Sequence, residues 1–252
     1  GRGLGREAAL ALAAAGWRVV LTAARAREEL EATAAEIGAD RALPLLADAG
    51  DPADAERTVA ETLARWGRLD ALVNNAGRGP REFSETFTTT PERFWTIPPE
   101  AWREIVRSNV DGPFLMARYA APAMVEGGWG RIVNVSTSRA TMVRAGYAPY
   151  GPTKAALDAM TRIFAADLAG TGVTVNALAP GGATDTAFIP GGTGRTGADG
   201  KLLPASVMTP ALLWLLSEAS DGVTAARLIG ARWDPADPAA CREDAGEPPL
   251  IL

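Results

Sequence analysis

Tyr150 and Lys154 are the two residues whose types and spacing best suit chemistry in this sequence. Side chains four positions apart lie on the same face of an α-helix, because one helical turn takes about 3.6 residues. The spacing therefore puts a phenol beside an ammonium group. A free tyrosine, with a pKa near ~10, moves protons poorly at neutral pH, and a neighbouring cation corrects this by stabilising the phenolate. The alternative is an ordinary i, i+4 pair on a helix surface.

The composition makes this pair less ordinary. Lysine and arginine together number 25 in the 252-residue chain, yet the only lysines are Lys154 and Lys201. Tyrosine occurs three times, at Tyr119, Tyr147 and Tyr150. A sequence that uses arginine at nearly every basic position keeps a lysine one helical turn after a tyrosine. We therefore interpret the pair as the proton-transfer half of an active site.

Several other classes of function are excluded by what the chain lacks. It has no histidine and a single cysteine, Cys241, so the common zinc ligand sets, a Ser-His-Asp triad and an internal disulfide are all ruled out. We expect no metal site. The net charge of -5 disfavours nucleic acid or an anionic membrane as a partner. With no signal-peptide pattern and no apolar run long enough for a bilayer, we expect a cytoplasmic protein.

The first residues of the chain form a glycine-rich stretch that runs into an Ala-rich amphipathic pattern over 7–15, which predicts a helix. Gly1, Gly3 and Gly5 would leave bare backbone N–H groups at the positive end of that helix, an arrangement that binds a pyrophosphate. The alternative is a flexible terminus. Such a loop ordinarily follows a strand, so we expect the first strand of the sheet to be missing from the given chain and the chain to fold poorly without it.

Strand and helix patterns then alternate along the sequence. Asp51 and Pro52 are typical of a helix N-cap and first helical position. The alternation predicts an α/β fold, a doubly wound parallel sheet with helices on both faces. The expected strands cover 17–22, 42–46, 69–73, 131–135, 173–178 and 227–230, and the expected helices cover 27–37, 52–66, 99–124, 150–169 and 211–219.

Two stretches break this alternation. Residues 78–98 hold four aromatic side chains among Thr, Pro and Glu, and residues 183–200 are rich in Gly and Thr. We expect the first to cover a substrate or simply to pack, and the second to form a lid over a bound ligand. The Pro-rich residues 232–252 are expected to form an irregular tail beyond a single domain, 1–231.

Taken together, these features resemble the short-chain dehydrogenase/reductase family, classical type, up to about Ala231. The resemblance rests on motifs in the family's order and spacing. They are the end of its glycine motif at Gly1, Gly3 and Gly5, its NNAG motif at Asn74–Gly77, its helix asparagine at Asn109, its YxxxK at Tyr150 and Lys154, and its PG at Pro180 and Gly181. The resemblance implies a Rossmann-like dinucleotide-binding domain.

The same resemblance implies the catalytic roles. Tyr150 would be the general acid/base, Lys154 would stabilise its phenolate and hold the nicotinamide ribose, and Asn109 would support a proton relay. The family's active-site serine lies thirteen residues before the tyrosine, where this sequence has Thr137. Threonine supplies the same hydroxyl donor. Thr137 is therefore assigned the role, with Ser138 in reserve, and the alternative is that these hydroxyls merely end a strand.

A cofactor site follows from the same motifs. After the second-strand pattern the chain has Arg25 and no acidic residue, so a 2′-phosphate is favoured over a free 2′-hydroxyl, and NADP(H) over NAD(H), which stays possible. Besides Tyr150 and Lys154, the expected cofactor-binding residues are Gly1, Arg2, Gly3, Leu4, Gly5, Arg25, Asp48, Ala49, Asn75, Ala76, Gly77, Pro180, Gly181, Ala183 and Thr184.

The predicted function is NAD(P)(H)-dependent reduction of a ketone, or oxidation of a secondary alcohol, by hydride transfer. One alternative is a dehydratase or epimerase on the same fold. Another is a dinucleotide-binding regulatory protein without turnover, although such a protein would have no need of Tyr150. The partner would be a small carbonyl or alcohol substrate, and the family resemblance further implies a homodimer or homotetramer.

Overall fold

The computed structural model describes residues 2–191 and 200–243, and all six strands in this part of the chain run parallel to their neighbours. One sheet joins β1 to β2, and a second has the order β3-β4-β5-β6. The strands are β1 (Val19–Ala23), β2 (Ala42–Leu46), β3 (Ala71–Asn74), β4 (Gly130–Val135), β5 (Val173–Ala179) and β6 (Arg227–Ile229). The predicted parallel α/β architecture is confirmed.

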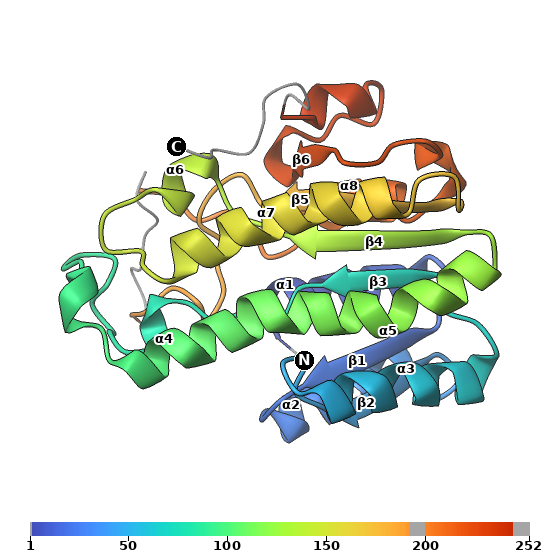
Figure 1. Cartoon of the computed structure of the whole chain (residues 1–252), viewed down its shortest axis with the longest axis horizontal. Helices are drawn as coiled ribbons and strands as arrows, with labels where there is room; N and C mark the ends of the chain where they lie inside the picture. The colour runs from blue at the N-terminus through green and yellow to red at the C-terminus, as the bar shows by residue number, and fades with distance from the viewer. Residues whose placement is uncertain (1, 192–199, 244–252) are drawn as a thin grey trace.

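Helices cover both faces of the strands, as Figure 1 shows for the long helices α5 and α7 that cross in front of them. The helices are α1 (Gly3–Ala14), α2 (Arg27–Ile37), α3 (Pro52–Trp66), α4 (Pro99–Val106), α5 (Gly112–Glu126), α6 (Arg139–Met142), α7 (Tyr150–Asp167) and α8 (Thr209–Leu215). Within the described residues, no helix combines the length and apolar character that crossing a bilayer requires.

The strand β4 shows how the two layers form. Ile132 packs in a cluster with apolar residues of α3, α5 and α7, whereas Val133 and Val135 pack in another with residues of α1 and α8. Successive side chains of a strand point to opposite faces, and a strand covered on both faces needs apolar residues on each. Every residue of β4 and β5 is buried, which is consistent with their place between two layers of helices.

The facing edges of β1 and β3 border a cavity of about 1410 Å³. Apolar residues of both strands line it, among them Val19, Leu21, Ala71 and Val73. Along this edge the backbone groups of β1 and β3 are not joined to each other by strand pairing, so β1 and β2 are linked to the rest of the core mainly through helices. The cavity continues to the glycine-rich start of α1.

Local sequence signals explain the elements whose ends were predicted correctly. The Asp51 carboxylate accepts hydrogen bonds from the backbone N–H groups of Ala53 and Asp54, and Pro52 begins α3. Gly67 ends this helix with a φ of 73°, in the left-handed region that favours glycine. These caps satisfy backbone groups that a helix leaves unpaired. As a result α3 has its predicted bounds, and so do α2 and β2.

The helix predicted over 99–124 differs from the observed one. Residues Pro99–Glu126 are helical, but a π-helical turn at Arg107–Asp111 separates α4 from α5. Such turns insert one extra residue, are rare, and occur often at functional sites. The turn contains Asn109, whose side chain is fully buried. No sequence periodicity marks this insertion, because the apolar pattern continues on both sides of it.

Other differences are smaller. The short helix α6 was not predicted, and α8 ends at Leu215 where a helix to Ala219 was expected, because a separate 3-10 turn covers Glu218–Ser220. The stretch 78–98 contains 3-10 turns at Pro80–Glu82 and Phe94–Thr96. In the tail, a 3-10 turn at Pro238–Cys241 buries the Cys241 side chain in the α1 and α8 core. The residues 192–199 of the predicted lid and 244–252 of the tail lie outside the described residues.

Candidate active site

Tyr150 is the first residue of α7, and Lys154 follows one turn later. The Lys154 Nζ atom lies 5.9 Å from the centre of the Tyr150 ring. It also donates a hydrogen bond of 2.8 Å to the backbone carbonyl of Val135, at the carboxyl end of β4. Lys154 is 4% exposed. The structure thus places the ammonium beside the phenol, in a buried position fixed by the central strand.

Burial shifts both groups in ways that matter for proton transfer. Desolvation raises the pKa of Tyr150 to about 12, while a hydrogen bond with Thr137 acts in the opposite direction. Desolvation lowers the pKa of Lys154 to about 8, and the nearby Asp158 carboxylate partly offsets this. Burial disfavours the charged form of each group, which explains why the two pKa values move in opposite directions. At neutral pH the phenol is therefore protonated and the amine is mostly charged.

The structure separates the two hydroxyl candidates. Thr137 is the hydroxyl near enough to the Tyr150 phenol to lower its pKa, against the larger effect of burial. Ser138 instead is the N-cap of α6, where its hydroxyl accepts from the backbone N–H of Thr141 at 3.2 Å and lies 2.8 Å from the Thr141 Oγ1. A capping hydroxyl is already engaged with the helix end. Thr137 is thus the hydroxyl that faces the phenol.

Asn109 holds the loop after β3 against α7. Its Oδ1 accepts a hydrogen bond from the backbone N–H of Arg78, and its Nδ2 donates to the Arg78 carbonyl and to the Thr153 Oγ1, at 2.8 to 3.0 Å. A Cβ atom added to Gly77 would lie 3.2 Å from the Asn109 Oδ1 and 3.6 Å from the Lys154 Nζ. The loop backbone therefore approaches the lysine closely at Gly77.

Aromatic rings cover the phenol on its outer side. Phe188 lies against Tyr150, with ring centres 5.2 Å apart, and Phe87 packs edge-on against both Phe188 and Tyr147. The Phe188 ring also occupies the space beside Gly79 that a side chain would need. Phe188 belongs to the predicted lid stretch and was missed as a site residue, because a lone aromatic in a Gly- and Thr-rich segment carries no signal of its own. Tyr147 is also part of this apolar wall.

The glycine-rich start of α1 meets two loops from elsewhere in the chain. A Cβ atom added to Gly5 would lie 2.6 Å from the Asn75 Nδ2, and one added to Gly3 would lie 3.1 Å from the Thr186 Cγ2. Gly3 has a φ of 54°. Only glycine fits this close approach at little cost. The result is a backbone cradle at the positive end of α1, the arrangement that binds a pyrophosphate. Gly1 lies outside the described residues.

Nine of the predicted cofactor residues line the large cavity, whereas Asp48, Tyr150 and Lys154 do not. Those in its lining are Arg2, Gly3, Leu4, Gly5, Arg25, Ala49, Asn75, Ala76 and Gly77. Pro180 and Gly181 lie outside the lining and pack on the end of β6, where the Pro180 carbonyl accepts from the Ala231 N–H at 2.9 Å. Ala183 and Thr184 pair with Leu203. The structure therefore brings together the residues that line the cavity, but it does not place Pro180, Gly181, Ala183 or Thr184 in that lining.

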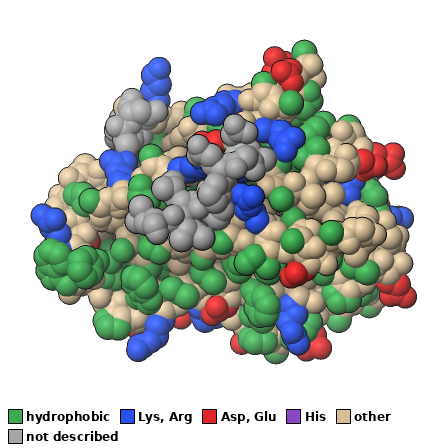
Figure 2. Space-filling model, turned by 45° about the horizontal axis from the view of Figure 1, so that its top comes forward, with side chains coloured by type: hydrophobic (Ala, Val, Ile, Leu, Met, Phe, Trp, Pro, Cys, Tyr) green, Lys and Arg blue, Asp and Glu red, His purple; other side chains and the backbone are tan. Residues whose placement is uncertain are grey.

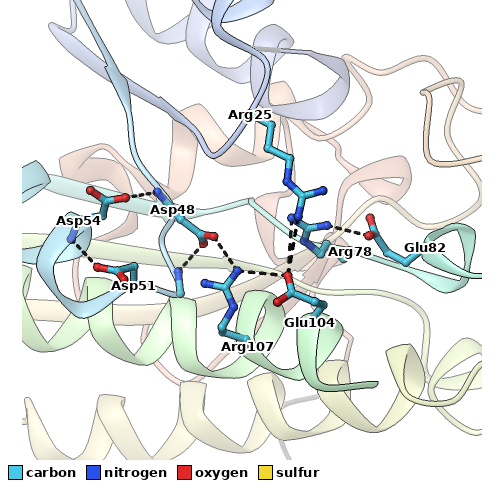
Figure 3. Close-up of polar contacts among 9 residues, drawn as sticks. Arg25, Asp48, Asp51, Asp54, Arg78, Glu82, Glu104 and Arg107 are labelled. Atoms are coloured by element: carbon cyan, nitrogen blue, oxygen red, sulfur yellow. Dashed lines mark hydrogen bonds and ion pairs between the residues drawn. The ribbon is translucent and has the colours of Figure 1, made fainter. Parts of the chain in front are cut away.

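An arginine cluster lies where the residues that line the cavity meet α4 (Figure 3). Arg25, Arg78 and Arg107 all approach the Glu104 carboxylate, at 3.9, 4.0 and 3.2 Å, and Arg107 also pairs with Asp48 at 2.8 Å. The Arg107 hydrogen bond is the main cause that lowers the pKa of Glu104. Arg25 is largely exposed, so water screens its weak ion pair and leaves it available to another anion. Arg78, Arg107 and Glu104 belong to no sequence motif and were not predicted.

Comparison with known proteins agrees with this geometry. The family model described as short chain dehydrogenase matches residues 1–190. The chain belongs to the short-chain dehydrogenase/reductase family. A 3-oxoacyl-[acyl-carrier-protein] reductase of Synechocystis sp. is 34% identical over 182 residues, which are 71% of this chain and 70% of the relative.

Solved structures of the same family extend the similarity. A 3-ketoacyl-(acyl-carrier-protein) reductase from Brucella melitensis, complexed with NADH, matches with a TM-score of 0.77 and 29% identity. The matched region includes 90% of this chain and 92% of the reductase chain. A short-chain dehydrogenase from Burkholderia cenocepacia J2315, in complex with NADP, matches with a TM-score of 0.78 and 29% identity. The matched region includes 90% of this chain and 91% of the dehydrogenase chain. The protein is thus an oxidoreductase of this family, with a Rossmann-like fold.

Proposed function

We propose that this short-chain dehydrogenase/reductase reduces a ketone, or oxidises the corresponding secondary alcohol, with Tyr150 as the proton donor or acceptor. One observation carries the proposal. The phenol is hydrogen-bonded to Thr137 and lies beside the buried ammonium of Lys154. A protein that only binds a dinucleotide could use Lys154 but would have no need of the Tyr150 phenol beside it.

Each residue then has a role that follows from its contacts. Tyr150 holds its proton at neutral pH and can give it to a carbonyl oxygen. Lys154 lowers the cost of the phenolate that remains, since opposite charges stabilise each other strongly in a buried site. Thr137 donates a hydrogen bond to the same substrate oxygen as negative charge develops there. Asn109 links the loop after Gly77 to the helix α7 through its hydrogen bonds with Arg78 and Thr153.

The residues present fit a nicotinamide dinucleotide. The cradle at Gly3 and Gly5 offers backbone N–H groups to a pyrophosphate, and the arginine cluster offers cations to a phosphate on the adenosine ribose. When bound, the nicotinamide supplies or accepts the hydride. We propose NADP(H) as the preferred cofactor, with NAD(H) possible, because Arg25 is exposed at the end of β1. The relatives complexed with NADP and with NADH support both.

The test is a substrate screen that follows nicotinamide absorbance. Purified chain is incubated with NADPH or NADH and a panel of ketones that includes 3-oxoacyl thioesters. Tyr150→Phe should abolish turnover and leave cofactor binding intact. The matched control Tyr147→Phe should retain most of the wild-type turnover. Cofactor binding without any change in absorbance across the panel would favour the regulatory alternative. Loss of water or epimerisation of a substrate, with no net change in the cofactor, would favour the dehydratase or epimerase alternative.

We also propose that the protein is a homodimer or homotetramer that associates through α5 and α7. Phe114 and Val125 on α5 and Ile163 on α7 are exposed apolar side chains. On the face shown in Figure 2, hydrophobic side chains gather over the lower left, with a few acidic and basic ones among them. Light scattering during size-exclusion chromatography tests the proposal. Ile163→Glu should shift the mass to that of a monomer, and a wild-type chain of monomer mass would contradict it.

A further inference from the structure

Asp158 lies one turn after Lys154 on α7 and is engaged at both oxygens. Its Oδ1 accepts a hydrogen bond of 2.5 Å from the Ser136 hydroxyl, and its Oδ2 accepts one of 2.8 Å from the Arg227 Nε. The side chains of Asp158 and Arg227 are only 12% and 10% exposed. A carboxylate and a guanidinium in such a position form a partly desolvated ion pair, which depends on good geometry and on further hydrogen bonds.

Arg227 comes from β6 and reaches the loop that follows β4. One of its terminal nitrogens donates to the backbone carbonyl of Thr137, and the other donates to the Glu243 carboxylate. Glu243 is also 3.8 Å from Arg139. The guanidinium therefore has a partner for each of its three nitrogens. These contacts fix the position of the Arg227 guanidinium, so it can hold the Thr137 carbonyl rigidly.

Three consecutive residues after the centre of β4 are thus held by three different charges. Lys154 binds the carbonyl of Val135, Asp158 binds the hydroxyl of Ser136, and Arg227 binds the carbonyl of Thr137. The last of these residues carries the hydroxyl that meets Tyr150. Any movement of the ion pair would move this segment, and with it the threonine hydroxyl and the acceptor of the lysine.

We infer that the Asp158–Arg227 ion pair is a positioning unit of the active site, which fixes the Thr137 hydroxyl against Tyr150 and stabilises the charged form of Lys154. The inference rests on the proposed function, because Thr137 acts on the substrate only if that function holds. A shift of about 1 Å in a positioning contact is worth up to about a hundredfold in rate. A purely structural ion pair would change stability alone.

The effect of the Asp158–Arg227 ion pair on the protonation of Lys154 depends on all the charged groups around this lysine. Asp158 is the acidic group that raises the pKa of Lys154, against the larger effect of burial. Tyr150 lies beside the lysine, Tyr147 next to Tyr150, and Arg227, Glu243 and Arg139 lie behind Asp158. Removing the Asp158 charge leaves Arg227 and Lys154 with one fewer anion, so the amine should lose its proton at lower pH.

Three variants separate the possibilities. Asp158→Asn removes the charge but keeps the shape, and Arg227→Lys keeps the charge but loses the fork that holds the Thr137 carbonyl. The matched control is Asp221→Asn, which breaks the ion pair with the buried Arg131 near the amino end of β4. Far-UV circular dichroism and cofactor titration verify that each variant is folded. Each is then assayed for kcat and KM across pH.

A second readout needs no activity. The chain has only two lysines, so a chain labelled with ¹³C-lysine gives one resonance each for Lys154 and Lys201, and their pH titration can be followed by NMR. We expect Asp158→Asn to lower kcat by about tenfold or more, with little change in KM. In that variant the Lys154 titration should move below its wild-type position of about 8. Arg227→Lys should lower kcat similarly with a smaller titration shift, and Asp221→Asn should change neither.

Two results would overturn the inference. One is an Asp158→Asn chain with wild-type kcat and an unmoved Lys154 resonance. The other is a loss of kcat in Asp221→Asn that matches the loss in Asp158→Asn, which would show a general effect of stability. Normal turnover by Tyr150→Phe would instead refute the proposed function. In that case the lysine titration alone decides, and an unmoved resonance would count against the ion pair.

Discussion

Replacing Lys154 by methionine should remove turnover and, at neutral pH, make the protein more stable. The pKa of this amine is lowered from 10.5 to about 8 by burial, which corresponds to about 3 kcal/mol of cost for keeping it charged in the folded state. Methionine fills a similar volume without that cost. It also leaves the Val135 carbonyl without its hydrogen bond, which costs about 1 kcal/mol. The expected net gain at pH 7 is about 2 kcal/mol.

The sign of this gain should change with pH. Between pH 8 and 10.5 the folded wild-type chain has released the lysine proton while the unfolded chain still binds it, so wild-type stability rises with pH in this window. The variant lacks this group. Its advantage should therefore disappear as pH rises, and above 10.5 it should be less stable than wild type by about the 1 kcal/mol of the lost hydrogen bond.

Urea unfolding of both chains at a series of pH values measures this difference. Titrating groups that both chains share and that do not face Lys154, such as Cys241, contribute nearly equally and cancel in the comparison. Lys201→Met is the matched control, because this lysine is exposed, and its free energy of unfolding should stay within about 0.5 kcal/mol of wild type. A Lys154→Met chain that is less stable at pH 7, or that keeps its turnover, would refute the reasoning.

Three further predictions use the same structure. Ketone reduction should fall as pH rises through about 8, because Lys154 then loses the charge that supports Tyr150; a rate that stays flat to pH 10 in kcat/KM profiles would contradict this. Arg25→Ala should raise KM for NADPH by about tenfold and leave KM for NADH nearly unchanged, as initial-rate kinetics would show. Backbone amides of β1 and β2 should exchange with deuterium faster than those of β4 and β5, because no pairing among the described strands joins these two sheets; equal protection would contradict that.

Much of the fold could be predicted because its signals are local. Asp51, Pro52 and Gly67 define the ends of α3 through caps that act within one turn of the chain. The strands β4 and β5 were recognised because a strand covered on both faces is rich in Val, Ile, Leu and Ala, even though single polar residues interrupt both runs. The π-helical turn around Asn109 could not be predicted. It depends on the contact of this side chain with Arg78 and Thr153, which lie far away in sequence.

The candidate site also has a part that local sequence predicted and a part that depends on distant residues. Tyr150 and Lys154 are a local pair, so their spacing alone predicted that they would lie together. The Asp158–Arg227 contact joins residues 69 positions apart, and neither belongs to a motif used in the sequence analysis. Phe188 reaches Tyr150 from a stretch without periodicity. Contacts of this kind depend on the tertiary fold, which brings the first residue of β6 to the middle of α7 and the segment after β5 to the start of α7.

The buried lysine explains why the site needs so many charges around it. A lone ammonium in this position would release its proton, because the neutral amine is cheaper to bury. Asp158 offsets part of that cost, but a carboxylate in the same region must itself be held, and Arg227 with Ser136 does this. Each charge thus stabilises the next, from β6 to α7. A protein selected for stability alone would gain by replacing this chain of charges with apolar residues. The proposed function accounts for the chain of charges, because it requires a charged amine beside Tyr150.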